Sequence, residues 1–250
     1  MSIFYSKSFY DRDYQRTRLS AEAVTTIVSN TFANAGASLR SVIDIGCGRG
    51  VWLVEFAARG VQQTLGRDGP WVNNPRLLIA PEHFVETDLS KPFTMSERFD
   101  LAMSLEVAEH IDELGAETFV DNLVQLSDTI MFSAAIAGQG GQHHVNEQPL
   151  SYWVQKFAQR GYRPVDALRP HIWNNQDICW WYRQNLVFFC RDSSPHLAAL
   201  ERYRDQAPAI LDLAHPQGFK EKAKLANLFS PEEYLALWFH RAKQAVFGAQ

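Results

Sequence analysis

Three glycines in a short turn, Gly46, Gly48 and Gly50, form the segment of this sequence best suited to hold a ligand. The turn follows an apolar run at residues 42–45 and precedes another at residues 51–56, which predicts a strand, a tight turn and a helix. Glycine lets the backbone turn sharply and approach a ligand closely, and the first amides of the helix favour an anionic group. We therefore expect a nucleotide-type cofactor. The spacing G-x-G-x-G differs from the G-x-G-x-x-G that holds a dinucleotide pyrophosphate.

Carboxylates stand near the ends of the apolar runs. Asp44 lies two residues before Gly46, and Asp68 ends a second run about 20 residues beyond the turn. Because a carboxylate only accepts hydrogen bonds, Asp68 suits two ribose hydroxyls, although a turn aspartate before Gly69 is an alternative. Asp88 closes a third run at residues 84–89.

This order of segments resembles the class I S-adenosyl-L-methionine (SAM)-dependent methyltransferases. The pattern D-x-G-x-G-x-G at residues 44–50 is similar to their motif I, and S-x-E-V-x-E-H at residues 104–110 is similar to their fourth strand and loop. The resemblance covers about the first half of the chain. It implies SAM as cofactor, Asp68 on the ribose, Asp88 facing the adenine amino group, and an N-terminal arm folded over the cofactor. The cofactor residues it implies are Tyr10, Tyr14, Asp44, Gly46, Cys47, Gly48, Asp68, Asp88, Leu89, Ser104 and Glu106.

Alternating strand and helix patterns predict an α/β fold with a doubly wound, Rossmann-like, mostly parallel sheet. The resemblance implies seven strands, the last of them, at residues 185–190, antiparallel. We expect an aromatic arm over residues 1–15, a helix over residues 19–32 capped by Ser20, and helices near residues 195–205, 218–228 and 231–247. The predicted domains are a SAM-binding, methyltransferase-like domain at 1–192, which includes the arm as a lid, and a helical extension at 193–250.

A polar, glycine-containing loop at residues 138–149 follows the fifth predicted strand, where a parallel sheet places its site loops. Its pattern resembles a bacterial subgroup that modifies sugars and secondary metabolites. A general base near neutral pH is expected at His144 or Glu147. Glu106 is expected near the transferring methyl group or the substrate, and Glu109 at a helix N-terminus. The candidate catalytic residues are His144, Glu147, Glu106, Asn146 and Tyr152.

Two alternatives for this loop stay open. One is a solvated loop with incidental histidines. The other is a metal site of two histidines and a glutamate, but we expect no metal, because the adjacent His143 and His144 rarely point the same way. A tryptophan-rich segment at residues 170–185 either packs in the core or lines a pocket around the sulfonium, where an aromatic face gains about 0.5–2 kcal/mol from a cation. Its candidate residues are Trp173, Tyr182 and Arg183.

The charge and the cysteine content of the chain limit which substrates and which cellular compartment are expected. A net charge of −4 over 250 residues gives no electrostatic footprint for nucleic acid, so we expect a small-molecule substrate. Three cysteines without metal spacing fit a reducing compartment, and neither a membrane span nor a signal peptide is expected, which favours a cytoplasmic protein. A homodimer stays open, because the apolar positions could face the domain or a second copy: Leu225, Leu228, Leu235, Leu237, Trp238 and Phe239.

These observations predict in-line methyl transfer to oxygen or nitrogen of a sugar or secondary metabolite, which requires alignment and exclusion of water. A first alternative is a cyclase that converts SAM to azetidine-2-carboxylate and methylthioadenosine. A second is a non-catalytic SAM-binding protein that docks a partner.

Overall fold

The computed structural model describes residues 7–72, 77–204 and 211–226, and the side chains of residues 14–72, 77–204 and 211–222. The chain divides into two compact units, Met1–Leu213 and Ala214–Gln250. The described part of the second unit contains the helix α8 (Pro216–Ala226). All other described elements belong to the first unit, which carries the candidate site.

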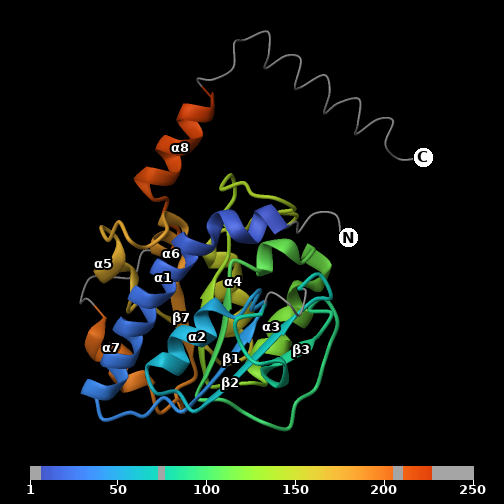
Figure 1. The fold of residues 1–250 in the computed structure, drawn as a ribbon. Helices are drawn as coiled ribbons and strands as arrows, with labels where there is room; N and C mark the ends of the chain where they lie inside the picture. Colours follow the sequence, from blue (N-terminus) through green and yellow to red (C-terminus); the bar gives the residue numbers. More distant parts are fainter. Residues whose placement is uncertain (1–6, 73–76, 205–210, 227–250) are drawn as a thin grey trace. The chain divides into compact units, whose positions relative to one another are not determined.

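A seven-stranded sheet in the order β3-β2-β1-β4-β5-β7-β6 forms the centre of the first unit (Figure 1). Strand β7 runs antiparallel to both of its neighbours, β5 and β6, and the remaining pairs are parallel. The predicted Rossmann-like sheet with an antiparallel last strand is therefore confirmed. The strands are β1 (Ser41–Ile45), β2 (Gln63–Asp68), β3 (Phe84–Glu86), β4 (Leu101–Leu105), β5 (Thr129–Ser133), β6 (Arg163–Val165) and β7 (Val187–Cys190).

Helices cover both faces of the sheet. Alternating side chains of a strand point to opposite faces, so Val42 packs with the helices α1 and α2 while Ile43 packs with α3 and α4. Figure 1 shows α1, α2 and α7 grouped together. The helices of the first unit are α1 (Lys7–Asn34), α2 (Val51–Ala58), α3 (Ala116–Val124), α4 (Leu150–Ala158), α5 (Arg169–Ile172), α6 (Trp180–Asn185) and α7 (Leu197–Tyr203), with short 3₁₀ turns η2 (Pro81–His83), η3 (Ala108–His110) and η4 (Glu113–Gly115).

The first helix corrects two predictions. It begins at Lys7, so most of the expected arm is helical, because residues 7–34 contain neither glycine nor proline to interrupt a helix. Ser20 is not its N-cap. The Ser20 hydroxyl lies inside the helix, where it donates to the Arg16 carbonyl (2.8 Å) and accepts from the Cys179 amide (2.9 Å). Ser20 thereby ties α1 to the segment that precedes α6.

The C-terminal predictions have mixed outcomes. Helices α7 and α8 lie close to the predicted ranges 195–205 and 218–228, whereas the predicted helix at 231–247 lies outside the described residues. Helix α7 packs against α1 within the first unit. The division of the chain at residue 192 stays a prediction. Among the described helices, none combines the length and the apolar character needed to cross a membrane.

Candidate functional site

The glycine turn after β1 has the backbone geometry that its sequence predicts. Gly46, Gly48 and Gly50 all have positive φ, at 87°, 52° and 83°. An added Cβ on Gly46 would lie 2.3 Å from a methyl group of Val107, so a side chain at Gly46 has no room. The Gly46 amide donates to the Arg67 carbonyl (2.7 Å), which holds the turn against the end of β2. The turn is therefore fixed beside the carboxyl ends of β1 and β2, where α/β folds bind ligands.

Two buried carboxylates lie next to this turn. Asp68 accepts from the amides of Gly48 and Gly69, both at 2.7 Å, and its oxygens keep lone pairs for further donors. Burial raises the pKa of Asp68 to about 6, and these two amides partly oppose that rise. Burial, and then the charge of Asp68, raise the pKa of Asp44 well above its ordinary value. A ligand that donates hydrogen bonds to these oxygens would favour their ionised forms.

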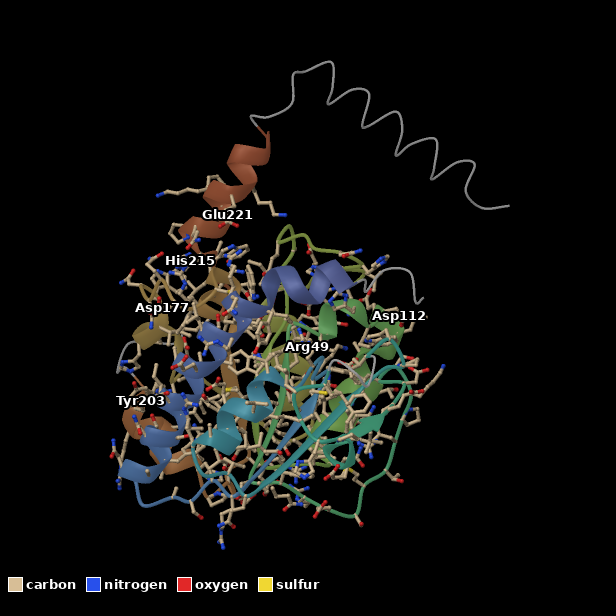
Figure 2. The ribbon with its side chains drawn as sticks, in the orientation of Figure 1. Arg49, Asp112, Asp177, Tyr203, His215 and Glu221 are labelled. Atoms are coloured by element: carbon tan, nitrogen blue, oxygen red, sulfur yellow. The ribbon has the colours of Figure 1, made fainter. Side chains whose placement is uncertain are left out.

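A cavity of about 240 Å³ opens in front of the turn. It is lined from α1 by Tyr14 and Thr17, and at its far side by the carboxyl-bearing Glu106. The Arg49 guanidinium lies 5.0 Å from the Tyr14 ring centroid, and Figure 2 shows Arg49 close beneath the α1 ribbon. The other lining residues are Asp44, Gly46, Cys47, Gly48, Arg49, Val51, Trp52, Leu105, Trp181 and Tyr182.

Six of the eleven predicted cofactor residues line the cavity: Tyr14, Asp44, Gly46, Cys47, Gly48 and Glu106. Asp68 lies next to the glycine turn but does not line the cavity, and three others lie elsewhere. Ser104 is fully buried on the opposite face of β4 from Leu105, and its hydroxyl donates to the Ile45 carbonyl (2.8 Å). Asp88 is exposed and accepts from the amide and hydroxyl of Ser90, while Leu89 packs in the core. Tyr10 lies in α1, but its side chain is outside the described ones.

Glu106 directly follows the carboxyl end of β4 and has an unusual backbone conformation. Its φ is 56°, and its amide donates to the Ser133 carbonyl at 3.0 Å. The carboxylate accepts from Gln139 Nε2 (2.8 Å) and Asn185 Nδ2 (3.0 Å). Burial raises the pKa of Glu106, and these amides partly oppose that rise. A non-glycine residue with positive φ beside a cavity indicates strain maintained by its surroundings, which is common at functional sites.

A second polar cluster lies beyond Glu106, between η3 and the loop at residues 138–149. Glu109, His110 and His144 place one potential ligand atom each within 4.8 Å of one another. The rings of His110 and His144 meet edge to face, with centroids 4.9 Å apart. Burial, followed by the charge of His144, lowers the pKa of His110 to about 4, so His110 is neutral near pH 7. His143, the neighbour of His144, is exposed.

The other candidate catalytic residues mainly organise this loop. Glu147 accepts from the Gly138 and Gly140 amides (2.9 and 2.5 Å) and from His144 Nδ1 (2.7 Å). The Asn146 amide donates to the Glu109 carbonyl (3.0 Å). Tyr152 packs edge to face on Trp153 and is not among the residues that line the cavity. Glu147 and Asn146 are thus positioning residues in this geometry.

The tryptophan-rich segment contributes to both the core and the cavity. Tyr182 and Trp181 line the cavity, whereas Arg183 is buried and donates to the Trp173 carbonyl (3.0 Å). Sequence reasoning gave no role to Arg49 or Thr17, which also line the cavity. The position of Arg49 inside the glycine turn could have indicated that it lines the cavity. Whether Thr17 faces the cavity depends on how α1 is rotated about its axis, and the sequence of α1 did not reveal that rotation.

The sheet order, the glycine turn and the cavity at the strand ends define a Rossmann-like protein that binds a nucleotide-type cofactor. A family model described as a methyltransferase domain matches residues 12–184. Because the match covers more than half of the chain, this chain belongs to the methyltransferase domain family. It carries the fold of a SAM-dependent methyltransferase.

Solved structures agree on the fold. Magnesium protoporphyrin IX methyltransferase from Synechocystis PCC 6803, with bound SAH, has a TM-score of 0.53 and 15% identity, over 76% of this chain and 97% of that one. CalS10, an amino pentose methyltransferase from Micromonospora echinaspora with bound SAM, has a TM-score of 0.52 and 14% identity, over 73% and 96%. The comparison with curated proteins found no match. The family assignment and these neighbours support SAM as the cofactor.

Proposed function

We propose that this chain transfers a methyl group from SAM to oxygen or nitrogen of a small molecule, such as a sugar or secondary metabolite. One observation carries the proposal: a single cavity joins the glycine turn to the strained, amide-held carboxylate of Glu106. The proposed cofactor-binding turn and a candidate general base thus line the same cavity. Amino pentose and sugar N-methyltransferases among the structural neighbours support this substrate class.

The cavity suits the methionine end of SAM. In this proposal the glycine turn accommodates that end, because a backbone without side chains can approach a ligand closely, and an added Cβ at Gly46 or Gly50 would clash with Val107 or Ile79. Arg49 pairs with the methionine carboxylate of SAM. Asp68 accepts hydrogen bonds from the ribose hydroxyls, and Asp88 faces the adenine amino group. The aromatic rings of Tyr14, Trp181 and Tyr182 lie where they could shield a sulfonium from water. When bound, SAM supplies an activated methyl group.

Glu106 is the base we propose for the acceptor. The amides of Gln139 and Asn185 fix its carboxylate, and these two side chains also bond to each other (2.9 Å). Such a network orients the carboxylate toward the cavity and restricts its rotamers. The loop at residues 138–149, by its place and by the pattern of its residues, is the proposed acceptor-binding segment.

The test is incubation of the purified protein with SAM that carries a deuterated methyl group, alone and with hydroxyl and amino acceptors. We expect SAH and a labelled acceptor in equal amounts, measured by mass spectrometry. Methylthioadenosine and azetidine-2-carboxylate from SAM alone would indicate the cyclase instead. Tight SAM binding without turnover on any acceptor would favour the non-catalytic alternative.

A further inference from the structure

The cluster of Glu109, His110 and His144 has no role in the cofactor cavity. Its three potential ligand atoms lie within 4.8 Å of one another, and Glu109 Oε1 lies 3.9 Å from His144 Nε2. Ligand atoms that surround Zn²⁺ tetrahedrally at 2.0–2.1 Å lie about 3.3–3.4 Å apart. To hold an ion, Glu109 and His144 therefore need to close by about half an ångström, and the most widely spaced pair by at most about 1.4 Å.

The buried carboxylate of Glu109 is the least satisfied group of the cluster. Its side chain is fully buried, and among the described residues neither oxygen has a hydrogen-bond partner within 3.5 Å, although the backbone amides of Glu109 and Ala135 lie near enough to favour its charged form. A buried, unpaired carboxylate is costly unless a proton or a cation compensates it. The charges of Glu106 and Glu147 act on Glu109 as well, which increases the need for a cation.

The histidines are oriented as metal ligands usually are. His144 Nδ1 lies 2.7 Å from Glu147 Oε1, and His110 Nδ1 lies 3.2 Å from the His143 carbonyl oxygen. Because both partners accept, each Nδ1 is the donor, so Nε2 is the nitrogen of the neutral ring that can coordinate a metal ion. Carboxylate and carbonyl partners of this kind fix the tautomer of metal-bound histidines. Glu147 is thus a positioning residue for His144.

We infer that Glu109, His110 and His144 bind a divalent first-row transition metal. Two imidazoles and one carboxylate suit Zn²⁺ and similar ions, and three protein ligands leave an open position for a water or a substrate oxygen. The inferred ligand at that position is a hydroxyl oxygen of the acceptor.

The metal's role rests on the proposed methyl transfer. Metal binding lowers the pKa of a bound hydroxyl. The O–H bond breaks and its proton passes to Glu106, the new O–C bond forms, and the S–C bond of SAM breaks to give SAH. The site therefore favours hydroxyl over amino acceptors.

The experiment measures Zn²⁺ binding to the full chain by calorimetry after treatment with a chelator. We expect one Zn²⁺ per chain. Glu109→Gln and His144→Gln should each weaken binding more than about 100-fold, and Glu147→Gln about 10–100-fold. His83→Ala, a change at an exposed histidine in η2, is the matched control and should leave binding unchanged. Co²⁺ provides a second readout, because its visible absorption reports the ligand number.

Circular dichroism and SAM binding verify that each variant folds. Zn²⁺ binding that is absent, or equal in wild type and both ligand variants, would overturn the inference. The two proposals fail separately: methyl transfer by a chain without Zn²⁺ affinity rejects the metal site, whereas Zn²⁺ binding without transfer rejects the function.

Discussion

At the scale of single residues, Glu106 is the side chain on which the proposed chemistry depends. Glu106→Gln keeps the size and the cavity lining but removes the base. We expect kcat to fall about 10²–10⁴-fold, because that is the usual contribution of general base catalysis, with little change in the Kd of SAM. The measurement is steady-state turnover with the acceptor identified by mass spectrometry. Glu113→Gln, an exposed acid in η4, is the control, and equal kcat values for both variants would contradict the role.

The raised pKa of Asp68 leads us to predict that cofactor binding depends on pH. Its pKa of about 6 lies above the value of about 3.9 for an unfolded aspartate, so the native state takes up a proton as the pH falls from 6 to 4. Protonation thus stabilises the free protein over that range, whereas ribose hydroxyls favour the ionised form. SAM affinity should weaken about tenfold between pH 7 and pH 5.

Calorimetry at several pH values measures this dependence. Asp68→Asn should bind SAM more weakly and lose most of the pH dependence. Glu113→Gln, a change at an exposed acid in η4, should retain it. An unchanged pH profile in Asp68→Asn would show that other groups cause the titration.

Which residues line the cavity could be predicted where a motif fixes the backbone. The prediction was less accurate where the direction of a side chain determines whether it reaches the cavity. Asp44, Gly46 and Gly48 line the cavity as expected. Ser104 does not, because it points to the other face of β4 from Leu105. In the second polar cluster the partner of His144 is His110 and not the adjacent His143, which no sequence spacing revealed.

At the scale of elements, the glycine turn combines backbone strain with a close contact. Gly46→Ala should destabilise the protein by roughly 1–2 kcal/mol for the positive φ, and by a further 1–3 kcal/mol or so for the clash with Val107. Gly36→Ala is the control, because Gly36 has φ +71° and no atom of the described residues lies within 4 Å of an added Cβ. Thermal and denaturant unfolding measure both variants.

The double variant Gly46→Ala with Val107→Ala isolates the steric part. We expect it to recover some of the stability that Gly46→Ala loses. Equal losses in Gly46→Ala and Gly36→Ala would contradict the contact with Val107.

The strands were easier to predict than the helix ends. Strands β1, β4 and β5 are buried on both faces, so their apolar runs stand out. Strand β6 was not located, because it has three residues and includes Pro164. The start of α1 was placed too late, because its first turns lack an apolar periodicity even though nothing in them breaks a helix.

At the scale of the whole molecule, the candidate site belongs to one unit. Every residue that lines the cavity falls between Tyr14 and Tyr182, within Met1–Leu213. A chain that ends at residue 213 should therefore keep its folded core and bind SAM within about twofold of the full chain. Calorimetry measures the affinity, and light scattering measures the mass. Loss of SAM binding would show that residues 214–250 help to build the site, and a change from dimer to monomer would place a homodimer contact there.

The most direct test of the central claim, that SAM binds in the cavity between α1 and the glycine turn, blocks the cavity from α1. Thr17 lines the cavity, whereas Leu19 in the same helix is 40% exposed and does not. Calorimetry should show one SAM per chain for the wild type and for Leu19→Trp, and binding at least about tenfold weaker for Thr17→Trp, a loss of about 1.4 kcal/mol. Wild-type affinity in Thr17→Trp, or no SAM binding by the wild type, would contradict the claim.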